Sequence, residues 1–149
     1  MDSNLDGELP SRLTDKPTWL IMHASPAAHR LFIDAMIAGG TRRYHYAILA
    51  TLAQFGPASQ AAIGRRCKID RSDMVTALNE LSENGLVTRD PDPADRRRNI
   101  ITITADGNRK LRKLDTLLER AHDELCAGLT PDERAQLVRL LNRLLAGLG

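Results

Sequence analysis

Aromatic residues, cysteines and long apolar runs are scarce in this sequence, and each scarcity narrows what the protein can be. Only 3% of the 149 residues are aromatic. Leu and Ala dominate the apolar side chains, a bias that suits helices packed on helices better than a β-sandwich. The two cysteines, Cys67 and Cys126, are too far apart to indicate a disulfide framework, which favours a reducing cytoplasm. No apolar run approaches the roughly 20 residues of a membrane-spanning helix, and the polar N-terminus has no signal-peptide pattern. We therefore expect a cytoplasmic protein with no membrane partner.

Motifs for catalysis and metal binding are also missing. The sequence has no glycine-rich phosphate loop, no nucleophile elbow and no pair of carboxylates in a pattern that indicates acid–base chemistry. No histidine has a second histidine three or four positions away, and neither cysteine lies at ligand spacing from one. The four histidines are His23, His29, His45 and His122. We therefore expect no enzyme, no metal site and no cofactor. Both cysteines are expected to be small buried residues rather than redox sensors.

Charge is small overall and unevenly distributed. The formal net charge is only +2, which is too little to indicate a nucleic-acid binder by itself. Residues 96–113, however, contain seven basic side chains against one acid, whereas residues 114–149 contain six acids against four arginines. A positive field confined to one segment is typical of a docking surface. The basic residues of this segment are Arg96, Arg97, Arg98, Arg109, Lys110, Arg112 and Lys113.

The N-terminal third contains one segment without periodicity and two helical patterns. Residues 1–17 are polar and contain two prolines, so we expect a flexible or loosely docked leader. Residues 18–40 have a helical pattern in which Pro26 predicts a kink or the first turn of a second helix, hence one short helix and one longer one. The next helix has an apolar stripe at helical spacing, formed by Tyr44, Ile48, Leu52 and Phe55.

Residues 59–85 have the pattern of a helix-turn-helix. Ser59 can cap a short helix that ends near Cys67, and Asp70 can cap a second helix that Asn84–Gly85 ends. The second helix has an apolar face formed by Met74, Ala77, Leu78 and Leu81. At 100° per residue, its opposite face carries Ser72, Thr76 and Asn79. Two such helices joined by a tight link predict a helix-turn-helix.

A β-hairpin with a basic tip follows the second helix. Residues 86–90 and 99–104 are β-prone runs that flank the segment PDPADRRR. Pro91 and Pro93 have no backbone N–H, so we expect this segment to stay unpaired and to protrude. A helix-turn-helix followed by such a hairpin is the pattern of a winged helix. The predicted fold class is therefore mainly α with one small β-hairpin, in which further helices flank a winged helix-turn-helix.

Two long helices with leucine stripes close the chain. Their stripes consist of Leu114, Leu118, Ala121 and Leu125 in the first helix, and Leu137, Leu141, Leu144 and Leu148 in the second. The second helix begins with Thr130 and Glu133 at capping-box spacing and with proline at its first position. Leu140 and Leu145 make its stripe wider than one neighbour can cover, and burying each leucine gains about 1.5–3 kcal/mol. We therefore expect a second subunit to cover the stripe, in a homodimer.

Three motifs follow one another along the chain: "LSENGLVTR", "DPADRR" and the closing Thr-x-x-Gly of Thr104–Gly107. In these motifs the chain resembles the MarR family of bacterial winged helix-turn-helix transcriptional regulators. The resemblance holds residue by residue from about Tyr44 to Gly107. One departure is Ile103, where the family usually has leucine, and the apolar role is kept. The resemblance implies a repressor that binds a pseudo-palindromic DNA duplex as a homodimer.

The resemblance also implies how the chain is divided. It gives a single MarR-like domain at 18–149, preceded by the leader at 1–17. Within this domain, the dimerisation helices would be residues 18–40 and 105–149, and the winged helix-turn-helix would be residues 41–104. The recognition helix would read the major groove of DNA, and the wing would enter the flanking minor groove.

Residue chemistry and the resemblance together indicate a DNA-binding set. Short polar side chains on the recognition helix suit base edges and phosphates, and arginine at the wing tip suits the narrow minor groove. Asp95 and Arg97 match the family's Asp-x-Arg wing motif, in which Arg97 would enter the groove and Asp95 would hold an arginine side chain in place. Arg96 and Arg98 would then contact phosphates. The predicted DNA-binding residues are Ser59, Arg71, Ser72, Thr76, Asn79, Asp95, Arg96, Arg97 and Arg98.

An effector and an alternative function complete the expectations. The resemblance implies a small aromatic or anionic ligand between the dimer helices and the DNA-binding lobe. The side chains that suit it best are Trp19, Tyr44 and His45, and Trp19 could equally anchor the leader onto the core. The alternative function is a winged-helix module for protein–protein interaction without sequence-specific DNA binding. Salt-sensitive binding to duplex DNA distinguishes the two functions.

Overall fold

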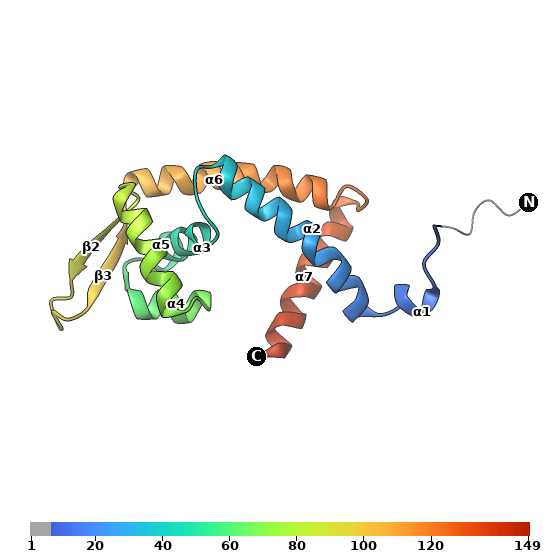
Figure 1. The fold of residues 1–149 in the computed structure, drawn as a ribbon, viewed down its shortest axis with the longest axis horizontal. Coiled ribbons are helices and arrows are strands. Elements are labelled where there is room, and N and C mark those ends of the chain that lie inside the picture. Colours follow the sequence, from blue (N-terminus) through green and yellow to red (C-terminus); the bar gives the residue numbers. More distant parts are fainter. Residues whose placement is uncertain (1–6) are drawn as a thin grey trace, which may run out of the picture. The chain divides into compact units, whose positions relative to one another are not determined.

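The computed structural model describes residues 7–149, which are mainly helical with one small sheet (Figure 1). This confirms the predicted fold class. The chain forms two compact units: Ile33–Asp123 is one, and Glu124–Gly149 with the residues up to Phe32 is the other. In the part of the chain that the structure describes, no helix combines the length and the apolar character of a membrane span. The elements in chain order are α1 (Ser11–Thr14), α2 (Pro17–Ala38), α3 (His45–Phe55), β1 (Ala58–Ser59), α4 (Gln60–Cys67), α5 (Arg71–Glu83), β2 (Val87–Pro91), β3 (Asn99–Ile103), α6 (Ala105–Leu125) and α7 (Pro131–Leu148).

The unit Ile33–Asp123 contains the apolar core. Helix α3 packs against α4 and β3, and α5 packs against α4 and β2. The largest fully buried side chains all belong to this unit: Met36, Ile48, Leu49, Leu52, Ile63, Met74, Leu78, Leu81, Ile101 and Leu114. The predicted stripe on α3 is wrong at Phe55, which is 54% exposed and stacks under the Arg66 guanidinium instead. A cation over an aromatic ring can hold such a side chain at the surface.

Short polar side chains begin the two helices of the helix-turn-helix, as predicted. Ser59 Oγ accepts a hydrogen bond from a first-turn N–H of α4 at 3.2 Å, and Asp70 Oδ1 does the same for α5 at 2.8 Å. Lys68, between the helices, adopts a left-handed conformation with φ of 55°. Gly85 has a φ of 70° and follows the end of α5 at the predicted position. Both ends of α5 are therefore defined by local sequence.

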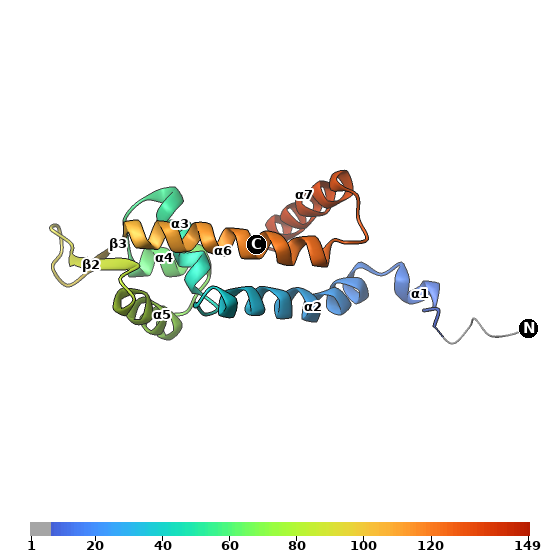
Figure 2. The same cartoon turned by 90° about the horizontal axis from the view of Figure 1, so that it is seen from above.

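The wing belongs to a three-stranded antiparallel sheet of order β1-β3-β2. The predicted hairpin is β2 with β3, and the two-residue strand β1 adds the pair Ala58↔Ile101 on the other side of β3. The prediction that Pro91 stays unpaired is wrong, because Pro91 is the last residue of β2 and lies opposite Asn99. An edge strand tolerates a residue without an N–H at this place. The hairpin extends beyond helices α3, α4 and α5 (Figures 1 and 2).

The Thr-x-x-Gly motif joins the wing to α6. Thr104 Oγ1 donates to the carbonyl of Gly85 at 2.7 Å and accepts from the N–H of Gly107 at 3.0 Å. The N–H of Thr104 donates to the carbonyl of Leu86 at 3.0 Å. Gly107 is buried directly against that same carbonyl, where there is no room for a side chain. The motif therefore connects the end of α5, the wing and the start of α6 at one point.

The N-terminal segment is more helical than the sequence predicts. Of the expected leader, residues 1–6 lie outside the described residues, whereas Ser11–Thr14 form the helical turn α1 and Pro17 begins α2. Helix α2 then continues without a break through Pro26, so the prediction of one short and one longer helix is wrong. A proline inside a helix removes one backbone hydrogen bond. Helix α2 continues despite this loss, because helical residues extend on both sides of Pro26.

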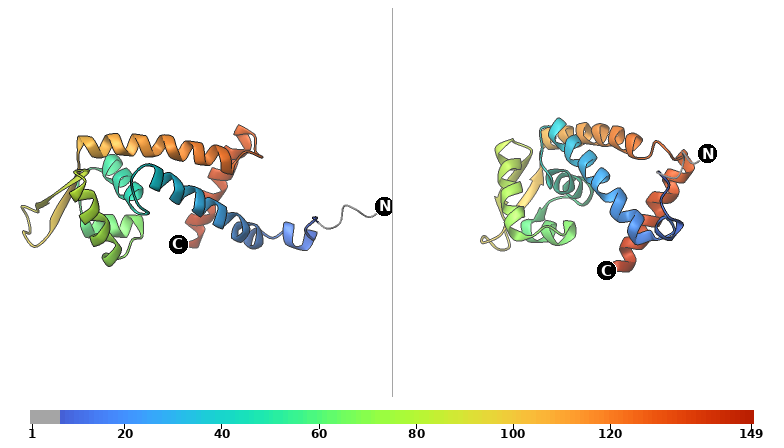
Figure 3. Two further views of the ribbon diagram at one scale, coloured as in Figure 1. Left: turned by 45° about the horizontal axis from the view of Figure 1, so that its top comes forward. Right: turned by 45° about the vertical axis from the view of Figure 1, so that its right-hand side comes forward.

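Helix α7 has the predicted capping box and no buried residue. Thr130 Oγ1 accepts from the N–H of Glu133 at 3.2 Å, and Glu133 Oε1 accepts from the N–H of Thr130 at 2.9 Å. The hydrogen bond from the Thr130 N–H lowers the pKa of the Glu133 carboxyl. Helix α7, drawn in red in Figure 3, has seven large exposed apolar side chains. They are Leu137, Val138, Leu140, Leu141, Leu144, Leu145 and Leu148. An apolar face of this length is expected to pack against another protein surface, because exposed apolar area is unfavourable in water.

Candidate nucleic-acid interface

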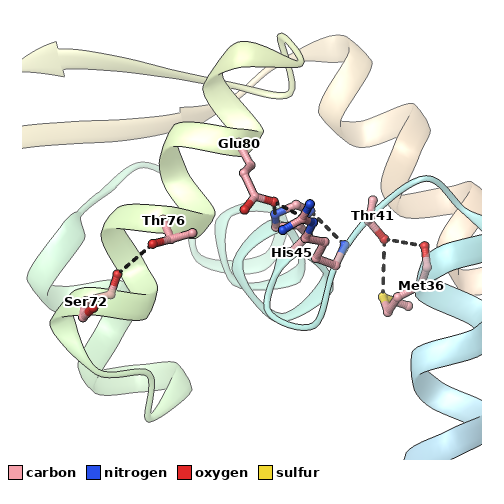
Figure 4. A network of polar contacts seen from close by, with 7 residues as sticks. Met36, Thr41, His45, Ser72, Thr76 and Glu80 are labelled. Carbon is pink, nitrogen blue, oxygen red and sulfur yellow. Dashed lines mark hydrogen bonds and ion pairs between the residues drawn. The ribbon is translucent and has the colours of Figure 1, made fainter.

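The exposed face of α5 carries the three polar side chains predicted to meet DNA bases. Ser72, Thr76 and Asn79 are all exposed, whereas Met74 and Leu78 of the same helix are buried. Thr76 Oγ1 donates to the carbonyl of Ser72 at 3.3 Å (Figure 4). This bond uses the hydroxyl proton and leaves the oxygen as an acceptor. The face therefore offers hydrogen-bonding groups to a ligand from a rigid helix.

The wing tip is a compact turn built around two aspartates. The N–H of Asp92 donates to the carbonyl of Arg98 at 2.8 Å, which closes the turn. The carboxylate of Asp95 accepts from the backbone N–H and from Nε of Arg97, each at 3.1 Å. These hydrogen bonds lower the pKa of Asp95. Asp95 thus holds the Arg97 guanidinium, whose side chain remains 91% exposed.

Arg98 connects the wing to the start of α4. Its Nη2 donates to Ser59 Oγ at 3.2 Å, the same oxygen that caps α4. Ser59 is only 7% exposed. The sequence predicts Ser59 as a DNA contact, whereas its buried hydroxyl is bound twice within the protein. In this structure Ser59 supports Arg98 and α4.

A basic cavity of about 560 Å³ lies between the tip of the wing, α4 and the start of α5. Its lining brings together Ser59, Arg71, Arg97 and Arg98 of the predicted set. Arg65 of α4 also lines it, although the sequence prediction missed this residue. Four guanidinium groups around one cavity create a positive potential suited to phosphate. The remaining wing arginine of the set, Arg96, is exposed and does not line this cavity.

Arg89 is a second residue of this surface that the sequence prediction missed. It lies in β2, is exposed, and donates from Nη1 to Oδ1 of Asn79 at 2.8 Å. No local sequence pattern pairs these two positions, because the contact depends on the packing of β2 against α5. The sequence of residues 86–90 indicates only a β-prone run.

A buried histidine anchors the inner side of α5. His45 is 3% exposed, accepts from the N–H of Arg42 through Nδ1 at 3.2 Å, and lies with Nε2 3.2 Å from Oε2 of Glu80 (Figure 4). Burial lowers the pKa of His45 below its usual 6.5, the Glu80 carboxylate opposes this shift, and the Arg42 charge adds to it. At neutral pH the ring is therefore uncharged. Its proton is on Nε2, which donates to Glu80.

The buried His45 predicts an acid-sensitive fold. Because the folded pKa is lowered, the unfolded chain takes up a proton that the folded chain resists, so stability is complete above pH 6.5 and falls as the pH decreases below it. The loss is at most about 1.4 kcal/mol for each pH unit. This loss in the free energy of unfolding is measured by urea unfolding of the wild type and of His45→Gln at pH 7.5 and 5.5. The variant should lose less stability than the wild type over this range, and equal losses would contradict the assignment.

Only one of the three predicted effector residues lines a second cavity. This cavity has a volume of about 500 Å³, and His45, Arg42, Glu80 and Glu83 contribute charged or titratable groups to its wall. It combines cationic and acidic side chains with the apolar side chain of Ile37. Such a mixture can bind an amphipathic small molecule.

The other two predicted effector residues have different surroundings. The ring of Tyr44 lies under the guanidinium of Arg43, with 4.9 Å between the guanidinium carbon and the ring centroid. Trp19 belongs to the other compact unit, where its ring stacks on His23 with centroids 3.7 Å apart. Tyr46 of α3 donates to Asp115, and its burial together with this carboxylate raises its pKa to about 12.

Potential metal ligands and thiols are scattered over the described residues. Within residues 7–149, no group of three or more His, Cys, Asp and Glu side chains is arranged to hold a metal ion. Both cysteines are free thiols of intermediate burial. The Cys67 sulfur lies 3.1 Å from Thr51 Oγ1.

Comparison with known proteins finds the same fold and a similarity to one family of regulators. The sequence profile of the MarR family matches residues 39–98, which include the helix-turn-helix and most of the wing. A candidate transcriptional regulatory protein for the hcr operon of Thauera aromatica is 35% identical over 99 residues, which are 66% of this chain and 60% of that protein. A helix-turn-helix transcriptional regulator of Bacillus subtilis, YkoM, is 31% identical over 66% of this chain and 64% of its own length. The chain thus spans about three fifths of the length of these curated relatives.

A solved structure matches nearly the whole described fold. The PcaV transcriptional regulator of Streptomyces coelicolor, in complex with its natural ligand, is 27% identical with a TM-score of 0.74, over 95% of this chain and all of that one. These relatives are named as regulators of transcription, which confirms the expectation that the chain is not an enzyme. The winged helix-turn-helix lies largely within residues 39–98, where the chain is similar to the MarR family of transcriptional regulators.

Proposed function

We propose that this protein is a transcriptional repressor that binds a pseudo-palindromic DNA duplex as a homodimer. The observation that carries the proposal is the basic cavity at which Arg65, Arg71, Arg97 and Arg98 meet, between the recognition helix α5 and the wing. Its arginines suit phosphates, and the adjacent polar face of α5 suits base edges. Two copies related by a two-fold axis would read half-sites about 34 Å apart, one helical turn of DNA. A dimer bound over a promoter would block transcription.

The apolar face of α7 supports the homodimer. None of its residues is buried within one chain, and its leucines are exposed to between 37% and 75%. Isolated helices of about 12–15 residues are marginal in water, so packing normally supplies most of a helix's stability. A second copy of the chain offers the same face and can cover it by self-complementary packing. The dimer would also give the two-fold symmetry that a pseudo-palindromic site requires.

Duplex binding should be strongly salt-dependent and should need Arg97. If six to ten phosphates are neutralised, affinity should fall by about 10³–10⁵ between 50 and 200 mM salt. Arg97→Ala should cost on the order of 1–3 kcal/mol of binding free energy, since the guanidinium ordered by Asp95 is lost from the minor groove. Gel-shift titration on duplexes selected from genomic fragments measures both. Arg12→Ala, which removes one exposed arginine from the other compact unit, is the charge-matched control and should bind like the wild type.

Two outcomes would favour the alternative function. If affinity for duplex DNA is weak and does not respond to salt, the winged helix serves protein–protein contacts instead. If Arg97→Ala and Arg12→Ala bind equally well, the wing does not enter the groove. In either case the basic cavity would need another anionic partner.

A small aromatic carboxylate is the effector that the second cavity suits best, and we include this ligand in the proposal. Arg42 offers a cation for the carboxylate, and His45 and Ile37 line the same wall. A ligand can release DNA only through different affinities for the two states of the protein, and a tenfold release needs about 1.4 kcal/mol. Repeating the gel-shift titration with benzoate tests this step. Release from the wild type but not from His45→Gln is expected, and no release from either would leave a constitutive DNA binder.

A further inference from the structure

We propose that Arg89 makes Asn79 a reader of guanine instead of adenine. The inference rests on the proposed function, because it requires α5 to lie in the major groove of DNA. It assigns Arg89, a residue outside the wing tip, the role of a positioning residue for base recognition. The consequence is a preference at one base pair of each half-site.

The geometry joins a strand of the sheet to the exposed face of the recognition helix. Nη1 of Arg89 lies 2.8 Å from Oδ1 of Asn79, an ordinary length for a strong hydrogen bond. The backbone of Arg89 is fixed, since it pairs with Ile101 in the middle of β2 and β3. Asn79 lies on the same face of α5 as Ser72 and Thr76. The contact therefore comes from a defined strand position to the helix face that would meet the bases.

The chemistry of the pair sets the orientation of the amide. A guanidinium has only donors, so the atom of Asn79 that faces it must be the carbonyl oxygen. The amide nitrogen, with its two N–H groups, is then the free end. It has no protein hydrogen-bond partner within residues 7–149. Asn79 is therefore presented to a ligand as a donor.

This orientation changes which base Asn79 favours. An unconstrained asparagine reads adenine by accepting from N6 and donating to N7, which requires its oxygen and nitrogen side by side at the base edge. In this protein the guanidinium already occupies the region beside the oxygen, where the N6 amino group of adenine would have to approach. Guanine presents two neighbouring acceptors, N7 and O6, to the major groove. The two N–H groups of Asn79 match these acceptors, so guanine is favoured.

Selection from a random duplex library, followed by titration of single base-pair variants, tests the proposal. The wild type, Arg89→Ala, Asn79→Ala and Asn79→Asp are compared at one salt concentration. Asn79→Asp retains an oxygen acceptor for Arg89 and lacks the N–H donors. Arg12→Ala is the control for the loss of one positive charge and should keep the ranking of the wild type.

The expected result is a change of base preference as well as of affinity. At the base pair whose ranking disappears in Asn79→Ala, the wild type should prefer guanine to adenine by about tenfold or more. Asn79→Asp should lose this preference too. Arg89→Ala should invert the ranking toward adenine, because its amide is free to turn. Loss of a phosphate contact alone would lower the affinity for all duplexes equally and leave the ranking intact.

Three results would overturn the inference. One is a preference of the wild type for adenine at that base pair, and another is an unchanged guanine preference in Arg89→Ala. The third is a library ranking that Asn79→Ala does not change at any position. Each of them leaves specific DNA binding, and hence the proposed function, intact. If the wild type enriches no duplex at all, the proposed function fails and the inference fails with it.

Discussion

Replacing Leu141 and Leu144 together by glutamate is expected to abolish self-association. Both leucines lie on the exposed apolar face of α7, and two carboxylates placed in the centre of a self-complementary interface would lose apolar burial and repel their counterparts. Sedimentation at micromolar concentration should change from dimer to monomer or to unfolded chain. Binding to a two-half-site duplex should fall by about 10²–10⁴, because each half-site is then bound independently.

Arg139→Glu is the matched control for this experiment. It changes the net charge by the same amount as two Leu→Glu replacements, and at 100° per residue it lies on the opposite side of α7 from the leucines. It should keep the dimer. A wild-type protein that sediments as a monomer at micromolar concentration would contradict the dimer itself. If both variants remain dimeric, other surfaces hold the subunits together.

Gly107→Ala is expected to be the most destabilising single substitution among the described glycines. An added Cβ would overlap the carbonyl oxygen of Leu86 and lie 2.6 Å from Cγ1 of Ile103. The oxygen belongs to the backbone and accepts from Thr104, so it cannot move without disturbing the joint between wing and α6. Overpacking of this kind costs about 1–3 kcal/mol or more, a large part of the 5–15 kcal/mol that typically stabilises a domain.

Thermal or urea unfolding measures the effect, with Gly128→Ala as the control. A Cβ at Gly128 would meet nothing within 4 Å, so this variant should unfold within about 0.5 kcal/mol of the wild type. Near-equal stability of the two variants would mean that the joint relaxes easily. The position of the wing relative to α5 would then be less rigid than the hydrogen bonds of Thr104 indicate.

Features that depend on neighbouring residues in the chain could be predicted from the sequence. Ser59 and Asp70 cap their helices, Gly85 follows the end of α5, and Thr130 forms the capping box of α7. Each of these depends on a few adjacent positions, where one side chain satisfies a backbone group of the next turn. The division between buried and exposed faces of α5 follows its helical period in the same way.

Features that depend on distant residues could not be predicted. Strand β1 is two residues long, and only its pairing with β3 makes it a strand. The contacts of Arg89 with Asn79 and of His45 with Glu80 join elements that pack together in three dimensions. Pro26 illustrates the opposite error, because a local rule about proline predicts a break that the helix does not have. Local signals therefore predicted most of the helices and the hairpin, whereas contacts between elements distant in sequence could not be predicted.

The edges of the small sheet have a consequence for how the protein behaves at high concentration. An unpaired strand edge is a template on which other chains can add strands and aggregate. Here one edge is the two-residue strand β1, and the other is β2, which ends in Pro91 and exposes Arg89 and Asp90. A strand this short, a missing N–H and adjacent charges all disfavour strand addition. The sheet thus projects its hairpin into solvent without offering an edge for fibril growth.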